Sequence, residues 1–357
     1  MAKALKDRYS GKFPVLLANY IHQEYPSFDE ATFVSKVFSE SWDGKSLKER
    51  MRHISICMNK LLDLDYPETI RLLKKVAPKV EDALAGMVFP DYVEVYGLDS
   101  WDISMSALEF FTKYSSSEFA VRPFIKKDPK KMMKQMEDWA RHENKHVRRL
   151  ASEGCRPRLP WADDIEEFKN NPSPILPILE HLKNDESKYV RRSVSNNLND
   201  ISKDHPEVVL DIANKWYGEN DYIDWIIKRG LRTLTKERNQ EAISLLGYNN
   251  VNYTKVVYLK LNKESLKKKK KLYFSFEVHT EKASKLMLEY SLDFMRPNGR
   301  VFKKIFKIKD GEFKKGITLF KKSHSFKDLS TRKHYPGEHR IAILINGVEK
   351  AVNNFIL

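Results

Sequence analysis

Apolar positions recur at helical spacing through the first two thirds of the chain. In Leu47–Leu62 they return every three or four residues, with strong helix formers between them. Similar amphipathic stretches occupy 29–40, 68–77 and 105–114. Prolines fall between such stretches, where they begin or end helices: Pro67, Pro78, Pro90, Pro123, Pro129 and Pro206. The pattern predicts one helix after another from residue 1 to about 248.

A repeat with a period near 40 residues occurs in the second half of this region. His146-Val-Arg-Arg149 is followed 43 residues later by Tyr189-Val-Arg-Arg192, and Ile227-Lys-Arg229 is a weaker third copy. Each copy lies in an expected helix that follows a polar turn. Helix pairs at this period are typical of HEAT-like α-solenoids. Because equivalent positions of a solenoid align on one face, we expect the paired arginines to form a ladder there.

After residue 250 the pattern changes to alternation of apolar and polar residues, as in Leu272–Val278 and Leu286–Phe294. Pro297-Asn-Gly299 and Asn346-Gly347 are turn signals, the second between two β-rich runs. About seven short strands in these 107 residues predict a small immunoglobulin-like β-sandwich, without the paired cysteines of antibody domains. The expected protein is therefore a multidomain α plus β chain: an α-solenoid of HEAT-like repeats over 1–248, then a β-sandwich over 251–357.

The net charge of +15 lies entirely in the second part of the chain. Residues 251–357 hold 25 Lys and Arg against 10 Asp and Glu, whereas residues 1–250 hold 39 of each sign. A single-sign field of this strength attracts a polyanion, either nucleic acid or an anionic membrane surface. A basic, well-solvated surface that has no partner is the alternative interpretation.

Several features bear on location. No apolar run approaches the roughly 18 residues that a membrane span requires. The first residues are charged where a signal peptide would be apolar. Cys57 and Cys155 make no disulfide framework. We expect a soluble, cytoplasmic, monomeric protein that needs neither a membrane nor a cofactor.

His142-Glu-Asn-Lys-His146 has the spacing of a metalloprotease zinc helix. Zinc would require both histidines on one continuous helical turn and a third ligand nearby. Here the string covers the polar turn before an expected helix, and Asn144 is unfavourable inside a helix. We therefore interpret it as a repeat turn and expect no metal site.

The segment Val147–Trp161 concentrates four arginines around Glu153. A helix should end near Gly154, and Pro157 and Pro160 should then hold the chain extended up to Trp161. Arginine forks suit phosphate oxygens, while a carboxylate and an exposed tryptophan suit a cationic group. The alternative is that the arginines pair with nearby acids and that Trp161 is buried between repeats. The segment by itself leaves both interpretations open.

Four segments resemble motifs of a known family, the bacterial DNA-alkylation-repair glycosylases with HEAT-like repeats, and specifically its AlkC branch. The resemblance follows the helical region in order, and some members of the branch carry a C-terminal immunoglobulin-like domain. One departure is Cys155, where the motif leads us to expect serine. The four segments are Leu47–His53, Ser115–Phe124, Arg148–Trp161 and Ser195–Asp200.

The resemblance implies an enzyme that cuts the N-glycosidic bond of cationic alkylated bases, such as 3-methyladenine and 3-methylcytosine, without flipping the base out of the duplex. It also implies site residues: Glu118, Glu153 and Asp200 as carboxylates, with Trp161 as the aromatic beside the lesion. The expected partner is double-stranded alkylated DNA. We expect phosphate contacts from basic residues of both parts: Arg122, Arg148, Arg149, Arg156, Arg158, Arg191, Arg192, Lys303 and Lys304.

Two other classes of function compete with a glycosylase. A non-catalytic DNA-binding HEAT-repeat scaffold would use the arginines and the basic domain, but it gives no reason for three acids on a surface meant for phosphate. A protein–protein adaptor is the commonest use of such solenoids, but it gives no reason for the basic second part. Incubation with methylated duplex DNA, followed by a search for free base, would separate the three.

Overall fold

A computed structural model describes residues 5–38, 41–248, 251–266, 270–296, 299–328 and 333–357. The chain divides into two compact units, residues 1–233 and 234–357, each of which is described by itself. Within the described residues, no helix is long and apolar enough to cross a membrane.

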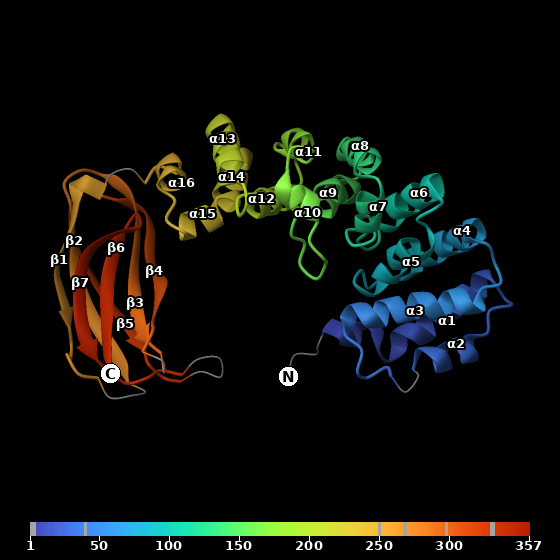
Figure 1. Ribbon diagram of the computed structural model, residues 1–357, viewed down its shortest axis with the longest axis horizontal. Coiled ribbons are helices and arrows are strands. Elements are labelled where there is room, and N and C mark those ends of the chain that lie inside the picture. The colour runs from blue at the N-terminus through green and yellow to red at the C-terminus, as the bar shows by residue number, and fades with distance from the viewer. Residues whose placement is uncertain (1–4, 39–40, 249–250, 267–269, 297–298, 329–332) are drawn as a thin grey trace. The chain divides into compact units, whose positions relative to one another are not determined.

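The first unit is helical throughout (Figure 1). Its α-helices have the following bounds: α1 Lys12–Glu24, α2 Glu30–Val37, α3 Leu47–Leu61, α4 Tyr66–Val76, α5 Val88–Tyr96, α6 Trp101–Phe111, α7 Arg122–Lys127, α8 Pro129–Ala140, α9 Lys145–Gly154, α10 Glu166–Asn170, α11 Leu176–Leu182, α12 Lys188–Ile201, α13 Pro206–Trp216 and α14 Asp221–Gly230.

Short polar signals start these helices where the sequence places them. Asp65 accepts a hydrogen bond from the Glu68 backbone N–H at the start of α4, and Pro67 follows it in the first turn. Asp128 caps α8 in the same way, with Pro129 as the first helical residue. The expected helix boundaries at these prolines are confirmed.

Helices of the second half pair into two layers, with α8, α11 and α13 in one and α9, α12 and α14 in the other (Figure 1). Helix α12 packs between α9 and α14, so each pair buries its apolar face against its neighbours. The helical-repeat architecture expected from the 43-residue period is confirmed.

The repeat extends to individual atoms. Arg148 Nη1 donates to the carbonyl oxygens of residues 142 and 143, and Arg191 Nη1 donates to those of residues 185 and 186. Likewise Ser152 Oγ donates to the residue 149 carbonyl, and Ser195 Oγ to that of residue 192. The arginine that opens each pair therefore ties its helix to the preceding turn.

The second unit contains an antiparallel β-sandwich. One sheet has the order β1-β2-β5 and the other β4-β3-β6-β7. The strands have the following bounds: β1 Thr254–Leu261, β2 Lys271–Thr280, β3 Ser284–Met295, β4 Val301–Phe313, β5 Gly316–Ser325, β6 Glu338–Ile345 and β7 Val348–Ile356.

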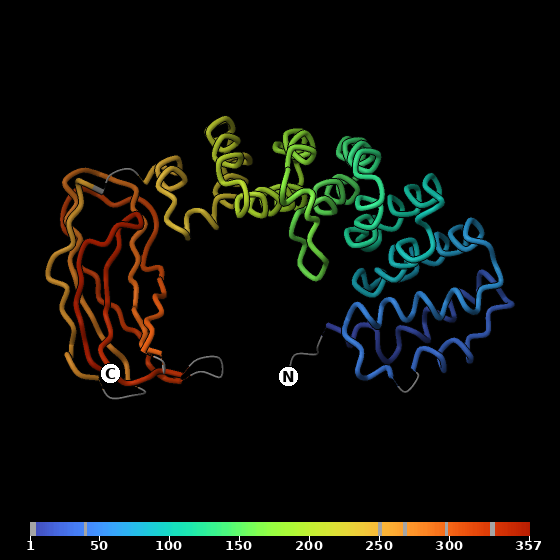
Figure 2. The backbone as a smooth tube through the Cα atoms, viewed as in Figure 1, coloured from blue at the N-terminus to red at the C-terminus, as the bar shows by residue number. Residues whose placement is uncertain are grey.

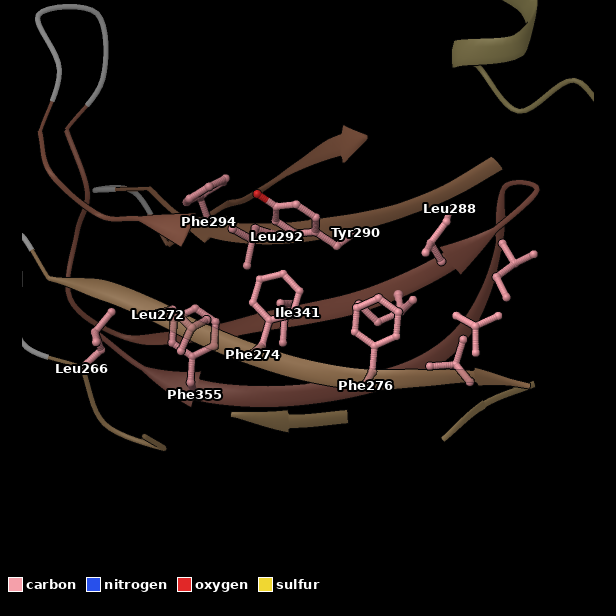
Figure 3. Packing of buried hydrophobic residues seen from close by; sticks show 14 of the residues in the cluster. Leu266, Leu272, Phe274, Phe276, Leu288, Tyr290, Leu292, Phe294, Ile341 and Phe355 are labelled. Carbon is pink, nitrogen blue, oxygen red and sulfur yellow. The ribbon is translucent and has the colours of Figure 1, made fainter. Parts of the chain in front are cut away.

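The inward-facing residues of both sheets fill the space between them (Figure 3). Phe274 and Phe276 of β2 and Tyr290 of β3 belong to this core, and the Phe274 and Tyr290 rings lie 5.1 Å apart. The immunoglobulin-like architecture is thus confirmed.

Asn346-Gly347 joins β6 to β7 with φ of 50° and 80°, the two positive values that a tight hairpin turn needs. This turn confirms the expected hairpin. In the other expected turn, residues 297 and 298 lie outside the described residues.

Two further helices, α15 (Arg232–Lys236) and α16 (Gln240–Leu245), lie next to the sandwich. Arg238, between them, pairs with Glu289 of β3 at 2.6 Å, and Lys285 Nζ donates to the Leu246 carbonyl. Asn346 Nδ2 donates to the Tyr248 carbonyl. The second compact unit, which begins at residue 234, therefore includes residues on both sides of the boundary near 248 that the sequence predicts.

Gly154, the last residue of α9, leaves no room for a side chain. A Cβ atom there would lie 2.6 Å from Val121 Cγ2 and 3.0 Å from Met136 Cε. We expect Gly154→Ala to lower the free energy of unfolding by about 1–3 kcal/mol through overpacking. Gly44→Ala is the control, because its nearest neighbour would be 3.8 Å away. Urea unfolding followed by far-ultraviolet circular dichroism checks this, and equal midpoints for the two variants would contradict it.

Candidate active site

Three carboxylates and two arginines alternate in one row, called here the charge chain: Glu118, Arg149, Glu153, Arg156 and Asp200. Arg149 Nη1 donates to Glu118 Oε2, and Arg149 Nη2 lies 3.5 Å from Glu153 Oε1. Arg156 Nη1 donates to the same Glu153 oxygen at 2.5 Å, and Arg156 Nε donates to Asp200 Oδ2 at 2.7 Å. The structure therefore brings together all three carboxylates expected from the sequence.

Four separate segments supply the charge chain. Glu118 lies in the turn before α7, where Ser116 Oγ donates to its Oε2 at 2.6 Å. Arg149 and Glu153 are one turn apart on α9, Arg156 follows that helix, and Asp200 lies near the end of α12. The row depends on the packing of α12 against α9, so the repeat architecture positions it.

The charge chain is shielded from water. The Glu118, Glu153 and Asp200 side chains are 15%, 7% and 3% exposed. Burial lowers the pKa of the Arg149 guanidinium, but the Glu118 and Glu153 carboxylates outweigh it and hold that pKa above its usual range. Three acids share two buried arginines. Beyond them, Lys203 Nζ lies 3.1 Å from Asp200 Oδ1. The buried part of the row has one acid in excess.

The connection between α9 and α10, residues 155–165, is called here the signature loop; it projects from the helical body (Figure 2). Trp161 lies on it with 58% of its surface exposed, so the expectation of an exposed tryptophan fits and a position between repeats does not. Its φ is +65°, a left-handed conformation that a bulky side chain rarely adopts. The Ile165 N–H donates to the Pro157 carbonyl and closes the loop below Trp161. Strain of this kind is typical of functional loops.

Arg122 supports the signature loop from inside. It is 4% exposed, and its guanidinium donates to the carbonyl oxygens of Gly154, Arg156 and Asp163. Burial lowers its pKa. All of these donors serve the backbone, so a supporting role fits Arg122 better than the phosphate contact expected from the sequence.

The other predicted arginines differ in how much of each faces solvent. Arg148 is bidentate to Asp185, and Arg191 is 8% exposed with Tyr222 3.7 Å from its guanidinium. The ladder of paired arginines is therefore mostly internal, because the first member of each pair serves its own turn. Arg158 pairs with Asp204, and both side chains are 26% exposed. Arg192 is exposed, with no side-chain partner found among the described residues.

His142 and His146 do not share a helical turn, because α9 begins at Lys145 with Asn144 as its cap. His142 Nδ1 accepts the Asn144 N–H, and His146 packs on the Tyr189 ring. Within the described part of the chain, no group of three or more His, Cys, Asp or Glu could hold a metal ion.

In the β-domain, the two lysines expected at DNA are already engaged. Lys303 pairs with Glu349, and Lys304 Nζ lies 5.5 Å from the centre of the Phe306 ring. Arg340 and then Lys303 lower the pKa of Glu349 to about 2, which marks a strongly paired cluster. Lys303 is consequently the less available of the two.

Sequence reasoning missed Ser116 and Tyr189. Ser116 Oγ contacts both Glu118 and Arg149, and the Tyr189 ring centre lies 5.1 Å from the Arg149 guanidinium. Ser116 was within a recognised motif, and Tyr189 opens the second repeat copy. The positions of Ser116 and Tyr189 in the sequence do not show that both side chains contact Arg149.

The chain is similar to several known proteins. Residues 92–244 match the family described as DNA alkylation repair enzyme, and residues 255–357 match the YhaZ C-terminal Ig-like domain. The uncharacterized protein YhaZ of Bacillus subtilis (strain 168) is 44% identical over 347 residues, 97% of each chain. The solved alkylpurine DNA glycosylase AlkC of Pseudomonas fluorescens, bound to DNA containing an abasic site analog, is 35% identical. That match covers 99% of both chains with a TM-score of 0.92.

The fold and the site define a helical-repeat protein that carries a buried row of acids and an immunoglobulin-like domain. The chain belongs to the DNA-alkylation-repair family, in the AlkC branch with a C-terminal immunoglobulin-like domain. The family resemblance inferred from four short motifs is confirmed.

The backbone of Trp161 gives a stability test that is independent of activity. Glycine adopts positive φ without the steric cost of a Cβ, so Trp161→Gly should be more stable than Trp161→Ala by about 1 kcal/mol. Trp161 is mostly exposed, so little packing is lost in either variant. Urea unfolding of the two full-length variants measures the difference, and greater stability of the alanine variant would show that the loop does not hold this conformation.

Proposed function

We propose that the protein is a DNA glycosylase that releases cationic N-alkylated bases, of the 3-methyladenine and 3-methylcytosine class, from duplex DNA without flipping the base. The observation that carries this proposal is the charge chain, three carboxylates with internal counter-ions. Arg156 of this row and the exposed Trp161 lie on the same signature loop. The solved relative, an alkylpurine DNA glycosylase bound to DNA, supports it.

A cationic base is already an activated leaving group, so its departure requires no general acid. The transition state instead develops positive charge on the deoxyribose, as in glycoside hydrolysis. A carboxylate about 4 Å away at an effective dielectric near 20 stabilises that charge by about 4 kcal/mol, or about three decades in rate. Arg149 and Arg156 fix the carboxylates beforehand, so no reorganisation is needed when the bond breaks.

In this proposal the Trp161 ring faces the cationic base or the sugar. An aromatic face contributes about 0.5–2 kcal/mol to a cation. Release of a neutral base would require a proton donor, and the site has no evident one among its charged residues. Preference for charged adducts then follows, and neutral adducts such as O6-methylguanine remain bound in DNA. A carboxylate of the charge chain orients the attacking water.

A non-catalytic DNA scaffold explains less. Each carboxylate of the row would repel phosphate, and Glu153 is held by two arginines that could otherwise serve DNA. Binding to the polyanion falls instead to exposed cations such as Arg192 and to the basic β-domain.

We infer a monomer acting on double-stranded alkylated DNA in the bacterial cytoplasm.

The first functional prediction concerns the acids of the charge chain. Glu153→Gln and Asp200→Asn should each slow base release at least tenfold, because they remove cation support while keeping side-chain shape. Duplex binding should be unchanged or tighter, because one charge that repels phosphate is lost. Release from methylated duplex under single turnover, with anisotropy for binding, measures both.

Glu219→Gln is the matched control, since it neutralises another ion-paired acid, the partner of Lys183. It should retain wild-type rates. Full activity of both Glu153→Gln and Asp200→Asn would remove the basis of the proposed mechanism.

The second functional prediction concerns the β-domain lysines. Besides Lys303 and Lys304, the second part of the chain holds other basic stretches, of which Lys267 to Lys269 lie outside the described residues. Lys321 and Lys322 of β5 are exposed, and no acid partner for them is found in the described part of the domain. If both lysines contact phosphates, the double variant Lys321→Ala/Lys322→Ala should reduce the slope of log K against log salt concentration by about 2, since each phosphate contact contributes about 0.9.

Lys303→Ala serves as the comparison, because its charge is already paired with Glu349 and should matter less. Anisotropy titrations at several salt concentrations give the slopes. An unchanged slope in the double variant would mean that neither Lys321 nor Lys322 of β5 touches DNA.

A further inference from the structure

Helix α3 carries a basic hollow that the charge chain does not use. It has a volume of about 420 Å³ and is called here the α3 hollow. Its floor and rim come from the first recognised motif and from α5. The lining residues are Lys45, Lys48, Glu49, Arg52, His53, Ile56 and Asp91.

Both acids of the α3 hollow are engaged inside the protein. Glu49 accepts the Ser46 backbone N–H in a capping box at the start of α3. Asp91 is 2% exposed, and its Oδ1 accepts a hydrogen bond from Arg52 Nε at 3.0 Å. Arg52 offsets the charge of Asp91, whereas Glu49 remains a charged carboxylate at the rim. The lining therefore holds three cations, Lys45, Lys48 and Arg52, against two acids, a formal net charge of +1.

Two buried acids fix the Arg52 side chain. Nε and Nη2 bind Asp91, and Nη2 also donates to Glu94 Oε1 at 2.5 Å. The guanidinium is 37% exposed, and no partner of its Nη1 is found among the described residues. One edge of the fork is thus held by carboxylates, which leaves the other edge to donate outward, the geometry in which arginine binds a phosphate oxygen.

The α3 hollow adjoins the turn that carries Glu118. Lys48 Nζ lies 4.8 Å from the centre of the Phe119 ring. Asp91 and Glu94 line a narrow gap together with Ser116 and Phe119. Ser116 is the residue that bonds Glu118 and Arg149. A group held by Lys48 and Arg52 would therefore lie beside the segment that positions the first carboxylate.

We propose that the α3 hollow binds one phosphodiester group of duplex DNA through Lys45, Lys48 and Arg52, and so holds the strand next to the Glu118 turn. This rests on the proposed function, because it takes alkylated duplex DNA as the ligand. The site gives a role to Leu47–His53, the motif that the charge chain leaves unexplained. It also supplies a cationic contact within residues 1–250, which are charge-neutral as a whole.

The test measures binding of duplex DNA containing an abasic-site analogue to the full-length protein at several salt concentrations. Lys48→Ala should raise Kd about tenfold and reduce the salt slope by about 1, as expected for loss of one phosphate contact. Base release at saturating DNA should change much less than Kd, which distinguishes a strand contact from a catalytic one. The matched control is Lys60→Ala, an exposed lysine at the far end of α3.

Arg52→Lys tests the orienting acids, because lysine keeps the charge but cannot hold Asp91 and Glu94 while also donating outward. It should weaken binding as well. If Arg52→Lys fails to fold, Lys48→Ala still decides. Salt slopes equal to wild type in Lys48→Ala overturn the proposal, whether the hollow is then empty or takes an acidic protein partner.

The two proposals fail in different ways. If the wild-type protein binds duplex and Lys48→Ala flattens the slope, but no base is released from methylated DNA, the phosphate site stands and the glycosylase function fails. If base is released from methylated DNA but Lys48→Ala leaves the salt slope unchanged, the glycosylase function stands and the phosphate site fails.

Discussion

The structure depends on Glu153 being shared by two arginines. Arg149 comes from the same helix and Arg156 from the loop that follows, and each reaches onward to a carboxylate from another segment. A buried carboxylate is tolerated only when it is paired and hydrogen-bonded, and removing one partner of such a pair is strongly destabilising. The row therefore locks the turn before α7, the end of α9 and the end of α12 into one arrangement.

That lock explains how three acids are held close together in the interior of the helical unit. Carboxylates without partners would reorient together with the water around them and would repel the DNA phosphates. Carboxylates fixed by internal arginines present an organised field to a cation. The signature loop completes the arrangement, since Arg122 holds its carbonyls from inside while Trp161 projects outward. Packing, loop strain and electrostatics therefore all act on the charge chain and the signature loop.

Much of this could be predicted from the sequence. The 43-residue period gave the helical repeat, alternation gave the sandwich, and motif resemblance gave the three carboxylates. The roles of Arg148 and Arg191 could not be derived, because a guanidinium binds whichever carbonyls its own turn leaves open, and spacing does not show them. The ion pair between Arg238 and Glu289 could not be predicted either, because it joins residues 51 positions apart and no local pattern contains it.

The central claim is that fixed carboxylates support positive charge on the sugar as the base departs. Single-turnover release of 3-methyladenine from duplex carrying deuterium at C1′ tests it most directly. An oxocarbenium-like transition state loosens the bonding at C1′, so the deuterated substrate should react more slowly than the protiated one. Equal rates, or faster reaction of the deuterated strand, would mean that water displaces the base in a tight, associative step, and would contradict the account.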